Sequence, residues 1–134
     1  MRACQPSREG YAERDGVKIY YEVFGTGEPT VLLLPTWSII HSRHWKMQVP
    51  YLARHCRLIT FDARGNGRSD RPTESAAYTE SEMASDAVAV MDATSTARAI
   101  IVGHSMGVQR DLLLANHPER VEAAAFIGPT YPGQ

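Results

Sequence analysis

The 134-residue sequence is long enough for one domain, and 43% hydrophobic with 22% charged residues is an ordinary globular composition. A formal net charge of -1, without a long run of Lys or Arg, argues against nucleic acid or an anionic membrane surface as a partner. We expect no transmembrane helix, because the sequence has no run of about 18 apolar residues. Cys4 and Cys56 are too few for a disulfide framework, so a cytoplasmic location is the simplest expectation. No cysteine or histidine cluster suggests a metal site.

The beginning of the chain is predicted to be a tail followed by a first strand. Residues 1–10 lack the apolar stretch of a secretion signal and are expected to form a disordered tail. One domain is then expected over 11–134. Within it, hydrophobic residues occupy every second position of 17–23, which predicts a strand with one buried face.

Four later segments are predicted to be buried strands. The runs 30–34, 57–61 and 99–102 are apolar at nearly every position, as in strands that are covered on both faces of a parallel sheet. The run 121–128 has the same character. Strands of this kind are covered by helices, so helices are expected between them.

Two helices are predicted among these strands. Thr79 and Glu82 can form a capping box at the start of the first, and apolar residues recur at helical spacing over 83–91. The second begins after Gly107 and ends near His117, before a proline. Strands that alternate with helices predict right-handed βαβ units and a mostly parallel sheet, so the expected fold class is α/β.

The segment GHSMG, residues 103–107, places Ser105 between two glycines. It follows a predicted strand and precedes a predicted helix, which is the setting in which a sharp turn exposes a nucleophilic serine. Side chains at Gly103 and Gly107 would collide with the neighbouring strand and helix, which gives both glycines a steric reason. The N-terminus of the helix would direct N–H groups toward an oxyanion formed near Ser105. The alternative is an ordinary turn that happens to contain a serine.

GHSMG resembles the nucleophile elbow of the α/β-hydrolase superfamily. Together with two further stretches and the strand pattern, the resemblance to this superfamily covers about residues 11–128. It implies a truncated α/β-hydrolase fold with about the first six strands. It also implies that Ser105 is the nucleophile, that Met106 gives a backbone N–H to the oxyanion hole, and that His104 is a structural part of the elbow. A serine nucleophile favours acyl chemistry over the dehalogenation or epoxide opening for which family members use Asp.

The two further stretches are loops that follow predicted strands. FDARGNGRSDRP, residues 61–72, resembles the loop after the family's fourth strand, where glycines make a tight turn and an Arg and an Asp hold it. LLLPTW, residues 32–37, lies where the family often has His-Gly, and Trp37 would give the second oxyanion N–H by its position. Because Pro35 and Thr36 replace the usual His-Gly, Thr36 is the alternative donor.

The resemblance does not extend to the groups that would activate the serine. Acyl transfer by a serine requires a base and a carboxylate that orients it, and in the family Asp or Glu and then His follow the serine. After Ser105 the only histidine is His117, and no acidic residue lies at a predicted strand end; the acidic residues are Asp111, Glu119 and Glu122. The seventh and eighth strands, with the acid and the base, are therefore expected to be absent, and the chain alone is expected to be weak or inactive.

Other titratable side chains are candidates for substitute or structural roles. His41 and His44 follow the expected oxyanion loop near the pocket mouth, and they are the best-placed substitutes for a base, although this role is not the expected one. His104 is expected to pack beneath the elbow, and His55 to lie on the surface. Asp62 is expected to brace the glycine-rich loop.

The segment 121–128 is predicted to be an exposed apolar edge, because the seventh strand that would pair with it in the family is missing. A homodimer, or a complementing second polypeptide, is expected to cover this edge.

Two functions follow from the sequence. The first is a serine hydrolase of the esterase, lactonase or carbon-carbon hydrolase kind, which would use Ser105 on a small-molecule ester or related carbonyl substrate and would need no cofactor. The second is a truncated, non-catalytic half-domain that acts as a binding or assembly partner.

Overall fold

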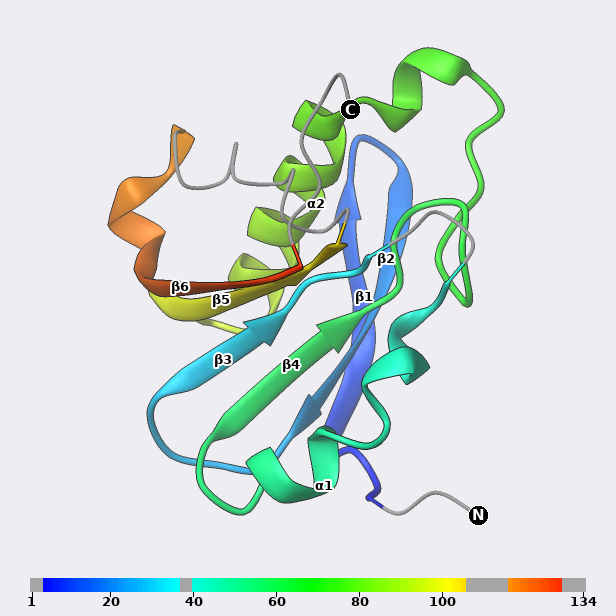
Figure 1. Cartoon of the computed structure of the whole chain (residues 1–134). Coiled ribbons are helices and arrows are strands. Elements are labelled where there is room, and N and C mark those ends of the chain that lie inside the picture. The colour runs from blue at the N-terminus through cyan, green and yellow to red at the C-terminus, as the bar shows by residue number, and fades with distance from the viewer. Residues whose placement is uncertain (1–3, 37–39, 106–115, 129–134) are drawn as a thin grey trace.

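The computed structural model describes residues 4–36, 40–105 and 116–128 (Figure 1). In this part of the chain, six strands form one twisted sheet with helices on both faces. The strands are β1 (Arg8–Arg14), β2 (Val17–Phe24), β3 (Thr30–Leu33), β4 (Arg57–Phe61), β5 (Ala99–His104) and β6 (Val121–Ile127). The helices are α1 (Val49–Leu52) and α2 (Glu80–Ala93), and the 3-10 turns are η1 (Ser42–Trp45), η2 (Ser75–Tyr78) and η4 (Pro118–Arg120). No helix in these ranges is long and apolar enough to cross a membrane.

The order of the strands across the sheet is β1-β2-β4-β3-β5-β6. The pairs β3/β4, β3/β5 and β5/β6 are parallel, whereas β1/β2 and β2/β4 are antiparallel. The predicted α/β class and mostly parallel sheet are therefore confirmed. Because the parallel strands all end at one edge of the sheet, the segments after β3, β4 and β5 come together there, as in other α/β folds that bind ligands at this edge.

The prediction of a disordered tail over 1–10 is wrong for residues 8–10, because β1 begins at Arg8. Ser7 donates its backbone N–H to a carbonyl of β2 at 2.8 Å, and Gly10 pairs with Tyr21 in an antiparallel register. The Tyr21 ring crosses closely over Gly10, where a Cβ would lie 2.9 Å from the Tyr21 hydroxyl. The prediction failed because β1 is an edge strand rich in charged residues, which gives it little hydrophobic periodicity.

The second half of β2 is buried on both faces, whereas the alternation predicted one buried face. Tyr20 and Glu22 are buried as well as their neighbours. The loop after β4 covers this second face: Asp62 N donates to Tyr20 O at 3.0 Å, and Ser69 Oγ accepts the Tyr20 N–H at 2.9 Å. The loop therefore satisfies the backbone of Tyr20 while it removes this face from water.

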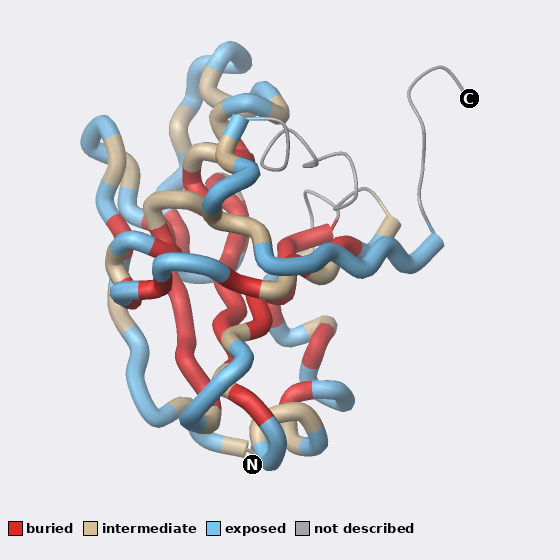
Figure 2. Tube along the Cα trace, turned by 90° about the vertical axis from the view of Figure 1, so that its left-hand side faces the viewer, coloured by how far each residue is buried: buried red, intermediate tan, exposed pale blue. Residues whose placement is uncertain are grey.

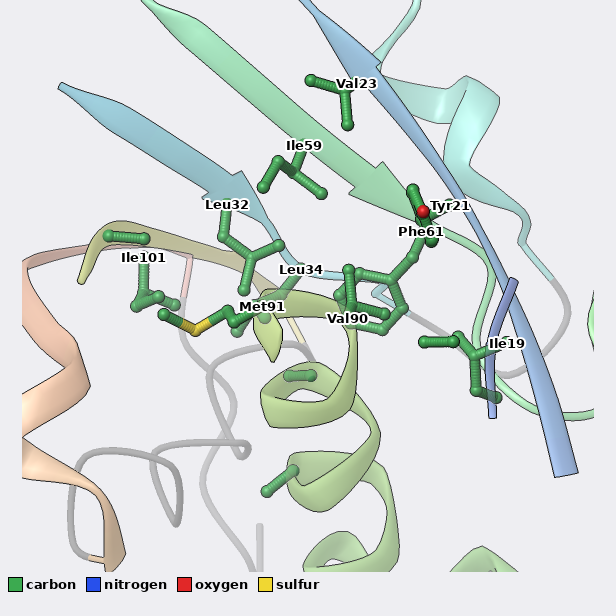
Figure 3. Packing of buried hydrophobic residues seen from close by; sticks show 14 residues of the cluster. Ile19, Tyr21, Val23, Leu32, Leu34, Ile59, Phe61, Val90, Met91 and Ile101 are labelled. Atoms are coloured by element: carbon green, nitrogen blue, oxygen red, sulfur yellow. The ribbon is translucent and has the colours of Figure 1, made fainter. Parts of the chain in front are cut away.

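The central strands divide their buried side chains between two clusters. On one face of the sheet, Leu32 and Ile59 pack against α2 (Figure 3). On the other face, Leu33 packs in a cluster with Trp45 of η1 and Val49 of α1. Because neighbours such as Leu32 and Leu33 belong to different clusters, β3 is covered on both faces, as its apolar sequence predicts.

Helix α2 confirms the helix predicted from Thr79. Thr79 Oγ1 accepts the N–H of Glu82 at 3.2 Å, which forms one half of the predicted capping box. The Glu82 carboxylate itself pairs with Arg14 of β1 rather than closing the box. The apolar face predicted over 83–91 is buried against the sheet.

A buried ion pair joins α2 to the loop after β4 and to β1. Asp86 of α2 is 1% exposed and accepts hydrogen bonds from Arg64 Nε at 2.7 Å and Arg64 Nη2 at 2.8 Å. Arg14 Nε donates to the same carboxylate at 3.2 Å. Arg64 and Asp86 are both almost fully buried, so each is the main compensation of the other's charge, although the more exposed Glu82 also lies 3.7 Å from Arg64 Nη1.

The two edges of the described sheet differ in chemistry. β1 carries two arginines and two glutamates along one edge. β6 lies at the other edge and is exposed along nearly its whole length, with Phe126 and Ile127 each 49% exposed (Figure 2). The exposed apolar strand predicted at 121–128 is therefore present in the described chain. Charged residues discourage strand addition at an edge, so β1 is protected along its length, whereas β6 has Glu122 near its start and no charge over 123–127.

Replacement of Asp86 is expected to destabilise the domain strongly. In Asp86→Asn the buried Arg64 guanidinium loses its closest carboxylate and keeps only the partly exposed Glu82, 3.7 Å from Nη1. The loss of one partner of a buried pair costs about 3 to 5 kcal/mol. Asp92→Asn is the matched control, because Asp92 lies on the same helix, is 64% exposed and pairs with Arg120 at 2.9 Å. The control is expected to cost about 1 kcal/mol or less. Urea unfolding measures both variants, and equal losses of unfolding free energy would contradict this role of Asp86.

Candidate active site

The segments that follow β3 and β5 meet at the carboxyl edge of the sheet. Leu34 N donates to Val102 O at 3.0 Å, and the Thr36 hydroxyl donates to His104 O at 2.8 Å. The indole N–H of Trp45 in η1 donates to Leu34 O at 3.2 Å. These bonds hold the predicted oxyanion loop, η1 and the end of β5 against one another.

Ser105 follows directly after β5 and has a φ of 54°, in the left-handed region of backbone conformation. A residue other than glycine is strained there by about 1 to 3 kcal/mol, and strain of this kind is concentrated at functional sites. A sharp turn at the end of a strand lifts the serine side chain away from the sheet, which is what a nucleophile elbow requires. The position of Ser105 after β5 and its positive φ are compatible with the turn that its motif predicts.

Other parts of the predicted elbow and oxyanion hole are described only in part. Gly103 is buried within β5 and pairs with β6. Trp37, Met106 and Gly107 lie outside the described residues, as does most of the helix predicted after Gly107, so their roles stay predictions. Thr36, the alternative oxyanion donor, is buried, and its hydroxyl holds the carbonyl of the residue before Ser105.

His104 is exposed, which contradicts the prediction that it packs beneath the elbow. Residues 100, 102 and 104 share one face of β5, and the cluster on this face includes Trp45 of η1. The His104 ring therefore lies beside η1, with its centroid 6.3 Å from the Trp45 ring and 6.4 Å from the His44 ring. His104, the residue before Ser105, thus lies beside the aromatic side chains of η1.

Among the described histidines, His44 has the chemistry that best fits a proton acceptor. Its Nδ1 lies 3.2 Å from His41 O, and because a carbonyl only accepts, Nδ1 carries the proton and Nε2 the lone pair of the neutral ring. Burial lowers the pKa of His44, and the nearby rings of His104 and His41 lower it further, although the hydrogen bond to His41 O acts the other way. Nε2 is buried and has no hydrogen-bond partner in the described chain, and no hydrogen bond joins His44 to Ser105 there.

The remaining described histidines are engaged elsewhere. Nδ1 of His41 accepts the N–H of Arg43 at 3.2 Å and so caps η1. His55 is exposed, as predicted, and its ring lies 5.1 Å from that of Tyr51. His117 precedes β6, whose amino end lies at the edge of the sheet opposite to the end of β5, because the two strands are parallel.

Asp62 braces the glycine-rich loop, as predicted. Its carboxylate accepts the N–H of Ser42 at 2.8 Å and the N–H of Arg68 at 3.0 Å, and its carbonyl accepts the Ser69 hydroxyl at 2.6 Å. Gly67 has a positive φ of 51° and lies so close that a Cβ there would be 2.1 Å from Asp62 Oδ2. The carboxylate therefore ties the loop to η1, and the close approach requires glycine.

A second set of bonds closes the same loop. The Arg71 guanidinium donates to Gly65 O at 2.8 Å and to Gly67 O at 3.1 Å. Gly65 has a φ of 84°, and a Cβ there would lie 2.9 Å from the Tyr78 ring. These contacts confirm the prediction that glycines make a tight turn in 61–72 and that arginine and aspartate side chains hold it.

Two residues that shape this region were not singled out from the sequence. Trp45 fills the space between η1 and the sheet, and Ser42 offers its N–H to the loop after β4. The spacing of Trp45 and Val49, four positions apart, is a helical signal that could have placed both on one buried side. Within the described ranges, no group of His, Cys, Asp and Glu side chains could hold a metal ion.

Comparison with known proteins agrees with this fold. The family model described as the alpha/beta hydrolase fold matches residues 29–133, which is most of the chain. The chain therefore belongs to the α/β-hydrolase family.

Several relatives are named as hydrolases. RutD of Caulobacter segnis, named as a carbamate hydrolase, is 38% identical over 106 residues, which are 77% of this chain and 40% of that protein. The 2-hydroxymuconate semialdehyde hydrolase of Pseudomonas sp. is 32% identical over 120 residues, which are 84% of this chain and 40% of that protein. The chain thus spans about 40% of the length of these relatives.

Solved structures share the fold. Est816, described as an N-acyl homoserine lactone degrading enzyme, superposes with a TM-score of 0.82 at 36% identity. The match covers 90% of this chain and 45% of the Est816 chain. The epoxide hydrolase VrEH1 from Vigna radiata has a TM-score of 0.81 at 26% identity and covers 89% of this chain and 37% of its own.

Gly67 is expected to tolerate no side chain. In Gly67→Ala the new methyl group must displace the Asp62 carboxylate, which holds the N–H groups of Ser42 and Arg68. Gly27→Ala is the matched control, because Gly27 also has a positive φ, of 85°, but open space where its Cβ would stand. The control is expected to lose about 1 to 2 kcal/mol from backbone strain alone, and Gly67→Ala about 1 to 3 kcal/mol more. Chemical denaturation measures both, and a smaller loss at Gly67 than at Gly27 would contradict the packing argument.

Proposed function

We propose that Ser105 is the nucleophile of a serine hydrolase that acts on a small-molecule ester or a related carbonyl compound. The observation that carries the proposal is the strained backbone of Ser105, directly after β5 at the carboxyl edge of the sheet. Strain of this kind has a reason at a nucleophile elbow, where the turn presents the serine oxygen to a substrate.

The names of the relatives favour a carbonyl substrate. One is named for a carbamate and one structure for an N-acyl homoserine lactone, and both compounds have a carbonyl carbon that a serine can attack. Several matching structures are epoxide hydrolases, but family members open epoxides with an Asp nucleophile, and this chain has Ser105 in the elbow. Esterase, lactonase or carbon-carbon hydrolase chemistry is therefore the proposal.

The proposed reaction begins with attack of Ser105 Oγ on the carbonyl carbon. A carbon-oxygen bond forms, the carbonyl electron pair moves onto the oxygen, and the Oγ proton passes to a base. Backbone N–H groups of Met106 and of Trp37 or Thr36 are proposed to stabilise this oxyanion. Its collapse expels the leaving group, which takes up the proton and leaves the acyl group on Ser105, and water then cleaves the acyl ester by the same steps.

The base is the group that this sequence supplies least well. His44 has a lowered pKa and a lone pair on Nε2, and its ring centroid lies 6.4 Å from that of His104, but it makes no hydrogen bond to Ser105. The Asp or Glu and the His that the family places after the serine have no match at a strand end after Ser105. We therefore propose that the chain alone turns over slowly and that full activity requires these two groups.

The second candidate function is that of a non-catalytic half-domain that serves in assembly. The exposed strand β6 favours it, because Phe126 and Ile127 are each 49% exposed at an edge without protecting charges on either residue. For either function, we propose that β6 pairs with a strand of a second copy of this chain or of a complementing polypeptide.

A fluorophosphonate probe, which reacts with activated serines, tests the nucleophile. Labelling of the chain is expected at Ser105, absent in Ser105→Ala and unchanged in Ser81→Ala, which removes an exposed hydroxyl on α2. Because the chain lacks an oriented acid and base, the rate of labelling at Ser105 is expected to be about 10⁴-fold or more below that of a complete α/β-hydrolase. Mass spectrometry of the labelled peptide identifies the site.

Two outcomes of this experiment would contradict the proposal. Equal labelling of the unmodified chain and Ser105→Ala would exclude Ser105 as the nucleophile. Fast labelling that is lost in His44→Gln would show that the chain supplies its own base, and it would overturn the proposed slow turnover.

The association of β6 is tested by light scattering after size-exclusion chromatography. The unmodified chain is expected to form dimers or larger species, and Phe126→Lys is expected to shift it toward the monomer, because a charge at an edge discourages strand addition. Tyr11→Lys is the matched control, since Tyr11 is 51% exposed on β1 at the opposite edge. A compact, stable monomer of the unmodified chain would refute the proposed association.

A further inference from the structure

A hollow of about 820 Å³ lies at the edge of the sheet opposite to the candidate active site. It forms where the amino ends of β3, β4, β5 and β6 meet the turn after α2 and the turn before β3, away from the arrowheads of β3 and β4 in Figure 1. Its polar lining includes two arginines and three hydroxyl groups; these are Arg57, Arg98, Thr30, Ser95 and Thr96. The size of the hollow is that of a site for a small molecule.

The guanidinium of Arg57 in this hollow is bound only by uncharged groups. Its Nη1 donates to Thr96 Oγ1 at 2.8 Å and to Thr30 Oγ1 at 3.4 Å, and its Nη2 donates to Thr94 O at 2.8 Å. No carboxylate of the described chain lies within ion-pair distance of it, and its Nε–H has no acceptor there. These bonds satisfy part of the donor set of the guanidinium, and the carbonyl end of α2 at Thr94 offsets part of its charge, but no carboxylate pairs with it.

Other partly or fully buried arginines of the described chain are neutralised. Arg14 and Arg64 pair with Asp86, and Arg120 pairs with Asp92. Burial lowers the pKa of Arg57, and the nearby cation of Arg8 lowers it further. Burial acts in the same direction on Arg14, but Glu82 and Asp86 raise the pKa of that group, whereas no carboxylate does so for Arg57. A bound anion would offset both effects, since it would supply the missing negative charge.

The rest of the hollow adds a second cation and two exposed carboxylates. Arg98 lines it and donates from Nη2 to Val121 O at 3.4 Å, again an uncharged partner. Glu28 and Glu122 also line it, and like Arg98 both are exposed, so water and salt weaken the charges of all three relative to that of Arg57. Arg57 is the least exposed ionic group of the lining, so its charge acts most strongly on a ligand.

We propose that this hollow binds a small phosphate-type oxyanion, with Arg57 and Arg98 as its cationic partners and the hydroxyls of Thr30 and Ser95 at its margin. Guanidinium groups match the geometry of phosphate oxygens and hold them through charge-assisted hydrogen bonds. The site lies at the edge of the sheet opposite to Ser105, and the proposal does not depend on whether Ser105 is a nucleophile.

Calorimetric titration of the full chain with inorganic phosphate, at constant ionic strength in chloride, tests the proposal. Saturable binding is expected, and Arg98→Gln is expected to weaken it at least about tenfold, which corresponds to the loss of one charge-assisted bond of about 1.5 to 3 kcal/mol. Glu28→Gln is expected to tighten binding, because it removes a repelling carboxylate from the lining. Arg71→Gln, which removes an exposed arginine from the glycine-rich loop, is expected to leave binding unchanged.

Arg98 carries the test because its side chain is exposed and its loss leaves the core intact. Arg57→Gln also removes bonds to the end of α2, so its result counts only if circular dichroism shows a folded protein. The absence of saturable phosphate binding to the unmodified chain would overturn the proposal. Equal weakening in Arg71→Gln and Arg98→Gln would overturn it as well, since it would show attraction by net charge alone.

Discussion

The buried pair between Arg64 and Asp86 is the interaction on which the rest of the described fold depends. It fixes the glycine-rich loop to α2, and Arg14 extends the connection to β1. Helix α2 supplies one cover of the sheet, and the loop supplies the cover for the second face of β2. If this pair were lost, α2 and the loop after β4 would no longer be held to each other by it. A buried guanidinium without its closest carboxylate is also costly in an apolar surrounding. The pair therefore stabilises the layers of the fold together and not one at a time.

The same loop extends this constraint toward Ser105. Asp62 holds the N–H of Ser42, which starts η1, and Trp45 at the end of η1 packs beside His104. From the other side, the hydroxyl of Thr36, in the segment after β3, donates to the His104 carbonyl. A strained residue persists only where its surroundings fix it from several sides. The bonds around His104 are the part of these surroundings that the described chain shows.

The sequence predicts much of the fold because the central strands are buried on both faces and read as apolar runs. It does not predict β1, whose charged residues serve as an edge, or the burial of Tyr20 and Glu22, which depends on a loop far along the chain. At the site, the turn at Ser105 follows from its motif. The exposure of His104 does not, because periodicity cannot tell which face of β5 lies beside η1. The tautomer of His44 likewise depends on a backbone carbonyl that only the fold brings near.

The parallel pairing of β3 with β5 has a consequence for how the protein reaches its folded state. β1 and β2 are joined by a short turn, so their pairing closes a small loop, whereas Val31 of β3 pairs with Ile100 of β5, far along the chain. Closing the longer loop costs more chain entropy, and contacts of this kind slow folding. The hydrogen bonds that align β5 with β3 are also those that bring His104 against the end of β3. The turn at Ser105 therefore forms with the most distant contacts of the sheet, and the chain completes its candidate site only when these contacts form.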